Sequence, residues 1–158
     1  MGWSTQKGSG GDQITLAGPR PAPTVLCVED NLSNLQLIER IFTRRGGVRL
    51  LTCTQGRQAC DLARQHRTDL ILLDLHLGDL DGEQVLAQLQ HDPSTGAVPV
   101  VVVSADANPE QARRLLAAGA REYVTKPLDI AQFLAVVDAI LQPAPPGPEL
   151  AGSVHPRW

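Results

Sequence analysis

The strongest constraint on the fold of this chain is the alternation between short apolar runs and longer amphipathic segments. Short runs rich in apolar and β-branched residues, bounded by turn residues, are typical of strands. We expect such strands over 24–28, 48–52, 70–73, 98–103 and 121–125. The run over 98–103 is apolar and is interrupted only by Pro99 near its start, which favours a strand buried on both faces of a sheet.

Each predicted strand is followed by a segment with helical periodicity. In the first of these segments apolar residues recur every three or four positions from Leu32 to Phe42, and Gly46 ends the helix. Asn108 and Asp129 are N-cap residues for the last two helices. The predicted helices cover 32–45, 56–66, 83–90, 109–118 and 130–141. The inward positions of the last helix are expected to be Ile130, Phe133, Leu134, Val137, Ile140 and Leu141.

Five strands and five helices in strict alternation predict a parallel sheet with helices on both faces, because parallel strands need crossover connections. The fold class is therefore open, doubly wound α/β. We expect one folded domain over 24–142. Residues 1–23 form a predicted flexible leader and residues 143–158 a predicted flexible Pro-rich tail, since neither has enough apolar residues to offset the entropy of ordering.

Composition excludes several classes of function. The net charge of −3 and the 3% aromatic content argue against a nucleic-acid-binding surface. No apolar stretch approaches the roughly 20 residues of a membrane span, and the first residues lack the apolar core of a signal peptide. Cys27, Cys53 and Cys60 form no CxxC pair and are expected to be small buried groups in a reducing compartment. We therefore expect a cytoplasmic protein.

Polar side chains follow four of the predicted strands at the point where each strand ends. These residues are Glu29 with Asp30, then Asp74, Ser104 and Lys126. Taken singly, the acids are explained as helix caps or turn residues, and the serine as one more turn residue. However, the carboxyl ends of parallel strands meet at one edge of the sheet, where such folds bind ligands. We therefore expect these side chains to converge.

Three carboxylates at one edge repel one another unless a cation lies among them. Carboxylate oxygens with open positions suit Mg²⁺ (or Mn²⁺), which binds through a few carboxylates and phosphate oxygens. A carboxylate beside such an ion can act as a nucleophile toward phosphorus. A lysine and a hydroxyl can hold the remaining phosphoryl oxygens. This set of residues is therefore complete for phosphorylation of an aspartate.

Four stretches of the chain, in this order and spacing, resemble the receiver domains of two-component response regulators. The likeness spans about residues 24–142 and implies the flavodoxin-like strand order 2-1-3-4-5. It also implies a phosphoacceptor role for Asp74. The four stretches are 25–31 (VLCVEDN), 70–75 (LILLDL), 100–105 (VVVVSA) and 123–127 (YVTKP).

The resemblance also implies a Mg²⁺ or Mn²⁺ site. Glu29 and Asp30 correspond to the acidic pair that organises the metal ion, with Asp30 the direct ligand of the two. Asp74 and the backbone carbonyl of His76 supply further ligands. An Asp-x-His metal site that uses the His76 side chain is the less favoured alternative. The side chains of His76 and Asp106 lie where the family tunes dephosphorylation.

The remaining roles concern the phosphoryl group and the response to it. Ser104, Ala105 and Lys126 correspond to the residues that bind the phosphoryl oxygens. Tyr123 corresponds to an aromatic switch that follows the movement of Ser104. The bond between Lys126 and Pro127 is expected to be a cis peptide.

The resemblance implies a signalling domain rather than an enzyme, although it catalyses its own phosphorylation and dephosphorylation. Its partners would be a histidine kinase or a histidine phosphotransfer protein, and an unknown downstream protein, with no nucleic acid or membrane partner. A stand-alone regulator and the C-terminal receiver of a hybrid histidine kinase both remain open, as does a homodimer. Two alternatives are a degenerate receiver that only binds proteins, and a small aspartate-nucleophile phosphatase. The intact acid, hydroxyl and lysine set disfavours the first, and His76, where a phosphatase carries its second acid, disfavours the other.

Overall fold

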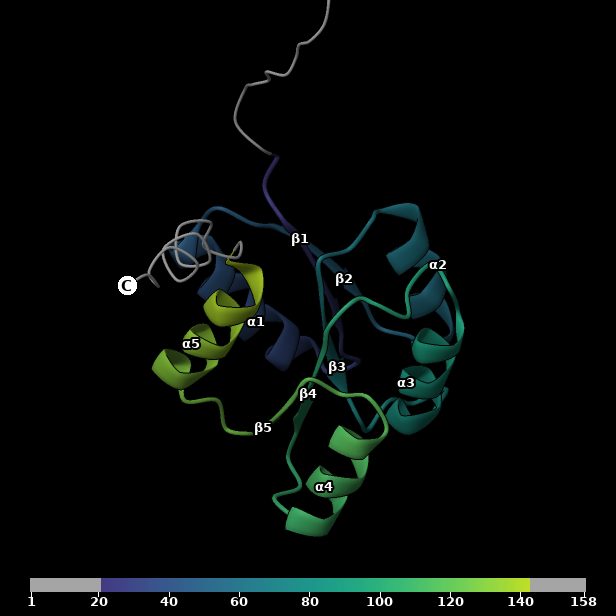
Figure 1. Cartoon of the computed structure of the whole chain (residues 1–158). Helices are drawn as coiled ribbons and strands as arrows, with labels where there is room; N and C mark the ends of the chain where they lie inside the picture. The colour runs from purple at the N-terminus through teal and green to yellow at the C-terminus, as the bar shows by residue number, and fades with distance from the viewer. Residues whose placement is uncertain (1–20, 143–158) are drawn as a thin grey trace, which may run out of the picture.

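The fold is a five-stranded parallel sheet covered by helices on both faces (Figure 1). It is seen in a computed structural model that describes residues 21–142. The order of the strands is β2-β1-β3-β4-β5, as expected. The strands are β1 (Thr24–Val28), β2 (Arg49–Cys53), β3 (Leu70–Asp74), β4 (Val100–Ser104) and β5 (Glu122–Thr125). The helices are α1 (Leu32–Arg45), the short 3₁₀ helix η2 (Gly56–Gln58), α2 (Ala59–Gln65), α3 (Gly82–His91), α4 (Pro109–Ala117) and α5 (Ile130–Leu141).

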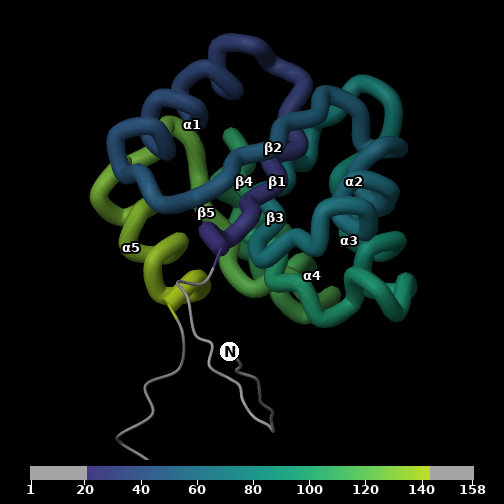
Figure 2. The backbone as a smooth tube through the Cα atoms, turned by 90° about the horizontal axis from the view of Figure 1, so that it is seen from above, coloured from purple at the N-terminus to yellow at the C-terminus, as the bar shows by residue number. Residues whose placement is uncertain are grey.

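The sheet separates two apolar cores. Helices α1 and α5 cover one face, where Phe42 and Phe133 meet edge to face with ring centroids 6.0 Å apart. Helices α2, α3 and α4 cover the other face, where Leu86 and Leu115 pack against the strands. Figure 2 shows α1 and α5 together on one side of the sheet and α2, α3 and α4 on the other. The three central strands are buried on both faces, in agreement with their continuous apolar sequences.

The register of the sheet brings the carboxyl ends of its strands to a common edge. Val28, the last residue of β1, is paired with Leu73, and Asp74 at the end of β3 is paired with Val103. Ser104 at the end of β4 is paired with Thr125. Residues that follow these strands therefore start from neighbouring positions, which is the geometric basis of the site described below.

Several predicted boundaries differ from the structure. The helix predicted over 56–66 begins as the 3₁₀ turn η2 and continues as α2. The strand predicted from Val98 begins at Val100, because Pro99 has no amide hydrogen to donate to a ladder. The expectation that Ile130 faces inward was wrong, since it is 48% exposed. Ile130 is the first residue of α5, directly after the β5–α5 connection.

No helix within residues 21–142 is long and apolar enough to span a membrane. The three cysteines are free thiols, with Cys27 and Cys53 buried and Cys60 partly buried. Burial raises the pKa of the Cys53 thiol to about 11 and also raises the pKa of the other two thiols. They are therefore poor nucleophiles at neutral pH. The predicted flexible leader and tail fall almost wholly outside the described residues.

Candidate functional site

Three carboxylates meet at the carboxyl edge of the sheet. Glu29 and Asp30 follow β1, and Asp74 is the last residue of β3. One oxygen from each lies within 4.8 Å of the others. Glu29 and Asp74 are buried, whereas Asp30 is exposed to solvent. The edge of the sheet therefore carries a concentrated negative charge with one side open.

Lys126 provides the positive charge at this edge. Its Nζ donates a hydrogen bond to Glu29 Oε1 at 2.9 Å and lies 3.5 Å from Asp74 Oδ1. The backbone amide of Lys126 donates to the carbonyl of Ser104 at 2.8 Å, which continues the pairing of β4 with β5 beyond Thr125. The peptide bond between Lys126 and Pro127 is cis. The ammonium group thus reaches the acids from the carboxyl end of β5, the strand that pairs with β4.

Burial and charge act together on Asp74. Burial raises its pKa, the nearby Glu29 carboxylate raises it further, and Lys126 opposes the rise. Burial lowers the pKa of Lys126, but the hydrogen bond to Glu29 and the charge of Asp74 outweigh burial and leave that pKa above its usual value. The lysine therefore stays charged at neutral pH. Its single positive charge does not balance the negative charges of all three acids.

Strand β4 ends in a hydroxyl residue, Ser104, one position beyond Val103, which is the strand partner of Asp74. Ser104 is fully buried, and its Oγ accepts a hydrogen bond from the amide of Asp106 at 3.1 Å. Ala105 and Asp106 are exposed. The hydroxyl of Tyr123 donates to the carbonyl of Asp106 at 2.6 Å and lies 3.2 Å from Oε1 of Gln111 on α4. Tyr123, on β5, is thereby connected to both the loop that follows Ser104 and to α4.

The β3–α3 loop, over residues 75–81, lies beside Asp30 and Asp74. His76 is exposed and forms an isolated antiparallel bridge with Asp81. Asp81 caps α3 through a capping box with Gln84. A Cβ atom added at Gly78 would lie 3.5 Å from Asp30 Oδ2, so this loop passes close to the open side of the acidic cluster.

The three carboxylates fit a small divalent cation. They offer hard oxygen atoms within a short distance, and the exposed Asp30 leaves the cluster accessible from solvent. The excess of negative charge that remains after pairing with Lys126 favours the same occupant. The chemistry of the donor set thus agrees with Mg²⁺ or Mn²⁺.

An apolar cavity of about 160 Å³ adjoins the site. Glu29, Asp74 and Lys126 line it together with Leu37, Ile38 and Leu128, and so it lies between the acids and the α1 side of the sheet. Its lining is mostly apolar, so Asp74 has apolar neighbours on this side.

The first acidic pair does not cap the helix that follows it, as the sequence allowed when each acid was taken singly. Asn31, and neither Glu29 nor Asp30, caps α1, because its side chain accepts a hydrogen bond from the amide of Asn34 at 3.0 Å. Glu29 Oε2 instead accepts from the amide of Asn31 at 3.2 Å. Sequence reasoning missed this cap, although an asparagine directly before a helical pattern is a recognisable signal.

Comparison with known proteins agrees with this geometry. The chain is 33% identical over 118 residues to the polar-differentiation response regulator DivK of Brucella anthropi, an alignment that covers 75% of this chain and 95% of that protein. It resembles the receiver domain of sensor histidine kinase PA1611 from Pseudomonas aeruginosa PAO1, whose structure has a magnesium ion coordinated in the active site cleft (TM-score 0.67, 30% identity, 75% and 96% covered). It also resembles the phosphorylated cyanobacterial phytochrome response regulator RcpA (TM-score 0.61, 29% identity, 75% and 90% covered).

The family model described as the response regulator receiver domain matches residues 25–138. This match spans the sheet, the carboxyl edge with its acids and lysine, and most of α5. The strand order and the flavodoxin-like arrangement of helices are those of the same family. The chain therefore belongs to the response regulator receiver domains of two-component signalling.

Proposed function

We propose that this chain accepts a phosphoryl group on Asp74 from the phosphohistidine of a histidine kinase or of a histidine phosphotransfer protein. One observation carries the proposal. Asp74 Oδ1 lies 3.5 Å from the Nζ of Lys126, and Asp74 has an oxygen within 4.8 Å of oxygens of two further acids. Phosphoryl transfer to a carboxylate needs a cation on the phosphoryl oxygens and relief of the repulsion between the acceptor and its neighbours.

In the proposed step an oxygen of Asp74 forms a bond to phosphorus while the P–N bond to the donor imidazole breaks. The imidazole keeps the electron pair of that bond. Lys126 donates to a phosphoryl oxygen from its half-buried position, where charge interactions are stronger than in water. The Ser104 hydroxyl and the Ala105 amide donate to the other oxygens, since Ser104 ends β4 and Ala105 follows it at the same edge.

Glu29, Asp30, Asp74 and the backbone carbonyl of His76 would hold the divalent ion. When bound, Mg²⁺ or Mn²⁺ supplies positive charge that offsets the acids and the charge on the phosphoryl oxygens. The magnesium ion in the PA1611 receiver domain supports this assignment. The exposed side chains of His76 and Asp106 flank the site and would set the rate of hydrolysis by controlling the approach of water.

The response would pass through Ser104 and Tyr123. When Ser104 turns toward the phosphoryl group, its Oγ leaves the amide of Asp106, whose carbonyl accepts from the Tyr123 hydroxyl. The position of Tyr123 against α4 then changes, and with it the surface of α4, β5 and α5 that a downstream protein binds. A coupling of about 1–3 kcal/mol is typical of such switches.

The three free thiols support a reducing, cytoplasmic setting.

Intact mass spectrometry tests the proposal. The protein is incubated with a small acyl phosphate, once with Mg²⁺ and once with a chelator, beside Asp74→Ala as the control. We expect a gain of one phosphoryl group in the wild type with Mg²⁺ and no gain in the control or with the chelator. A gain of the same size in Asp74→Ala would refute the assignment of the acceptor.

A further inference from the structure

A single carboxylate ties the β3–α3 loop to a distant part of the chain. Asp79 Oδ1 accepts a hydrogen bond from the amide of Gly56 at 2.8 Å, and Oδ2 accepts from the amide of Arg57 at 3.0 Å. The Nε of Arg57 donates to the same Oδ2 at 3.2 Å. The Asp79 side chain is 12% exposed, whereas that of Arg57 is 68% exposed. The two backbone bonds are therefore better shielded from solvent than the ion pair.

These bonds give η2 the cap that its own sequence lacks. The first amides of a helix have no partner within the helix. Gln55, which precedes η2, makes no side-chain capping bond. Asp79 supplies the missing acceptor from 23 residues further along the chain. The link is thus a tertiary contact on which both η2 and the β3–α3 loop depend.

Packing beneath the same contact is close. A Cβ atom added at Gly56 would lie 2.7 Å from Cγ2 of Val85, 3.1 Å from Cδ1 of Leu77 and 3.3 Å from Cβ of Leu80. Two of these neighbours, Leu77 and Leu80, flank Asp79 in the loop and join the core of α2 and α3. The loop is therefore held on η2 both by the carboxylate and by the apolar side chains on either side of it.

The β3–α3 loop, which Asp79 fixes to η2, also lies beside the acidic cluster. His76 follows Asp74 by two residues and is bridged to Asp81 across the loop. Gly78, the residue before Asp79, lies against the carboxylate of Asp30. A shift of the loop away from η2 would therefore move the backbone of His76 relative to Asp30 and Asp74.

We infer that Asp79 is a positioning residue for the divalent-metal site, because its bonds to Gly56 and Arg57 fix the carbonyl of His76 relative to the acidic ligands. The inference rests on the proposed function, since it takes Asp30, Asp74 and the His76 carbonyl as ligands. Asp79 itself is not one of the proposed metal ligands.

Mn²⁺ affinity, measured on the whole chain from the electron paramagnetic resonance signal of free Mn²⁺, tests this role without a phosphorylation readout. Asp79→Ala should weaken binding about tenfold, the low end of what loss of an outer partner costs a metal site. Asp79→Asn keeps one acceptor oxygen and should bind with intermediate affinity. Arg57→Ala removes only the exposed ion pair and should bind as the wild type does.

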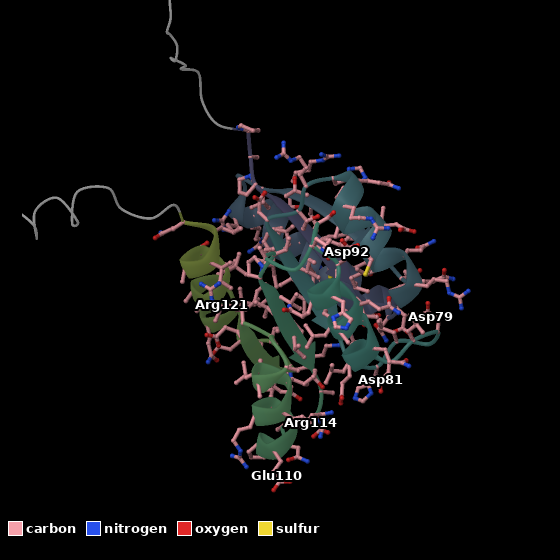
Figure 3. All side chains as sticks on the ribbon, turned by 45° about the vertical axis from the view of Figure 1, so that its right-hand side comes forward. Asp79, Asp81, Asp92, Glu110, Arg114 and Arg121 are labelled. Carbon is pink, nitrogen blue, oxygen red and sulfur yellow. The ribbon has the colours of Figure 1, made fainter. Side chains whose placement is uncertain are left out.

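Asp92→Ala is the matched control for a general loss of stability. Asp92 also accepts a backbone amide, that of Ser94 at 2.8 Å, and pairs with an arginine, Arg64. It lies just beyond the last residue of α3, whereas Asp79 precedes that helix, and Figure 3 labels both residues. Asp92→Ala should leave Mn²⁺ affinity unchanged. All variants are compared at a temperature at which circular dichroism shows them folded, and Asp79→Asn replaces Asp79→Ala where the latter unfolds.

Two results would overturn the inference. One is wild-type Mn²⁺ affinity in a folded Asp79 variant, and the other is an equal loss of affinity in Asp92→Ala. A wild-type chain that binds no Mn²⁺ would refute the metal site itself, and the inference with it. That outcome is distinguishable, because it is read on the wild type before any variant is compared.

Discussion

The ammonium nitrogen of Lys126 is hydrogen-bonded to Glu29 at 2.9 Å, although the two residues are 97 positions apart in the chain. The same nitrogen is further from Asp74, at 3.5 Å. The lysine therefore compensates Glu29 more fully than Asp74. Asp74 remains a buried carboxylate with an incompletely balanced charge. Burial, together with the charge of Glu29, raises its pKa.

Replacement of Asp74 by asparagine should stabilise the fold. Asp74→Asn keeps the shape of the side chain and removes the buried charge beside Glu29, so the free energy of unfolding should rise by about 1–2 kcal/mol at neutral pH. Urea unfolding in the presence of a chelator measures the difference. Glu39→Gln, at an exposed position on α1, serves as the control and should change stability little. A less stable Asp74→Asn would show that the charge of Asp74 is already balanced.

The start of α3 should not tolerate a side chain at Gly82. A Cβ atom there would lie 2.5 Å from Cα of Leu75 and 2.6 Å from the carbonyl oxygen of Asp74, both of them backbone atoms. Gly82→Ala should therefore cost at least about 2 kcal/mol of unfolding free energy. In the same loop, Gly78→Ala makes only an ordinary contact of 3.5 Å and should be tolerated. Equal unfolding free energies for the two variants would contradict this reading.

The contribution of Asp79 to stability should disappear in acid. The amide of Arg57 is the main cause that holds the pKa of Asp79 well below its usual range, and the amide of Gly56 adds to the effect. Because the pKa is lower in the folded state, the stabilisation is complete above the unfolded value of about 3.9 and is lost as the pH falls toward the folded value.

The difference in unfolding free energy between the wild type and Asp79→Asn measures this contribution. It should be constant between about pH 5 and pH 7 and shrink below about pH 4. A difference that grows as the pH falls would contradict the assigned direction of the pKa shift.

The turn after α2 stores local strain at Arg67. Its φ of 47° lies in the left-handed region, which glycine occupies without penalty. Arg67→Gly should stabilise the fold by about 0.5–1 kcal/mol, because relief of this strain exceeds the added entropy of the unfolded chain. Thermal unfolding measures the gain. Gln65→Gly, two residues earlier within α2, should instead cost about 1 kcal/mol, and a loss of similar size in Arg67→Gly would rule out the strain.

The fold could be predicted from sequence because its signals are local and repeat along the chain. Strands with continuous apolar sequence, such as the run over 98–103, could only be buried between helices, and alternation with helices then required a parallel sheet. The convergence of Asp74 and Lys126 followed from the rule that the carboxyl ends of parallel strands meet at one edge. That rule needs no knowledge of any single contact.

The parts that could not be predicted depend on tertiary contacts. Nothing in the sequence around Asp79 indicates that its partners are the amides of Gly56 and Arg57, more than 20 residues earlier. The preference of Lys126 for Glu29 over Asp74 is a matter of a few tenths of an ångström. Ile130 fits the apolar face of α5 by helical periodicity and is nevertheless exposed. Periodicity does not show how far along the helix the surface that packs against α5 extends.

Asp74 is the residue that we propose to carry the phosphoryl group. The most direct test of this proposal is reduction of the phosphorylated protein with borohydride, which converts an acyl phosphate on aspartate to homoserine, followed by mass spectrometry of the peptides. We predict homoserine at position 74 in protein treated with an acyl phosphate and Mg²⁺, and unmodified Asp74 in protein treated with a chelator. Homoserine at Asp30, or a phosphorylated residue elsewhere with Asp74 unmodified, would contradict it.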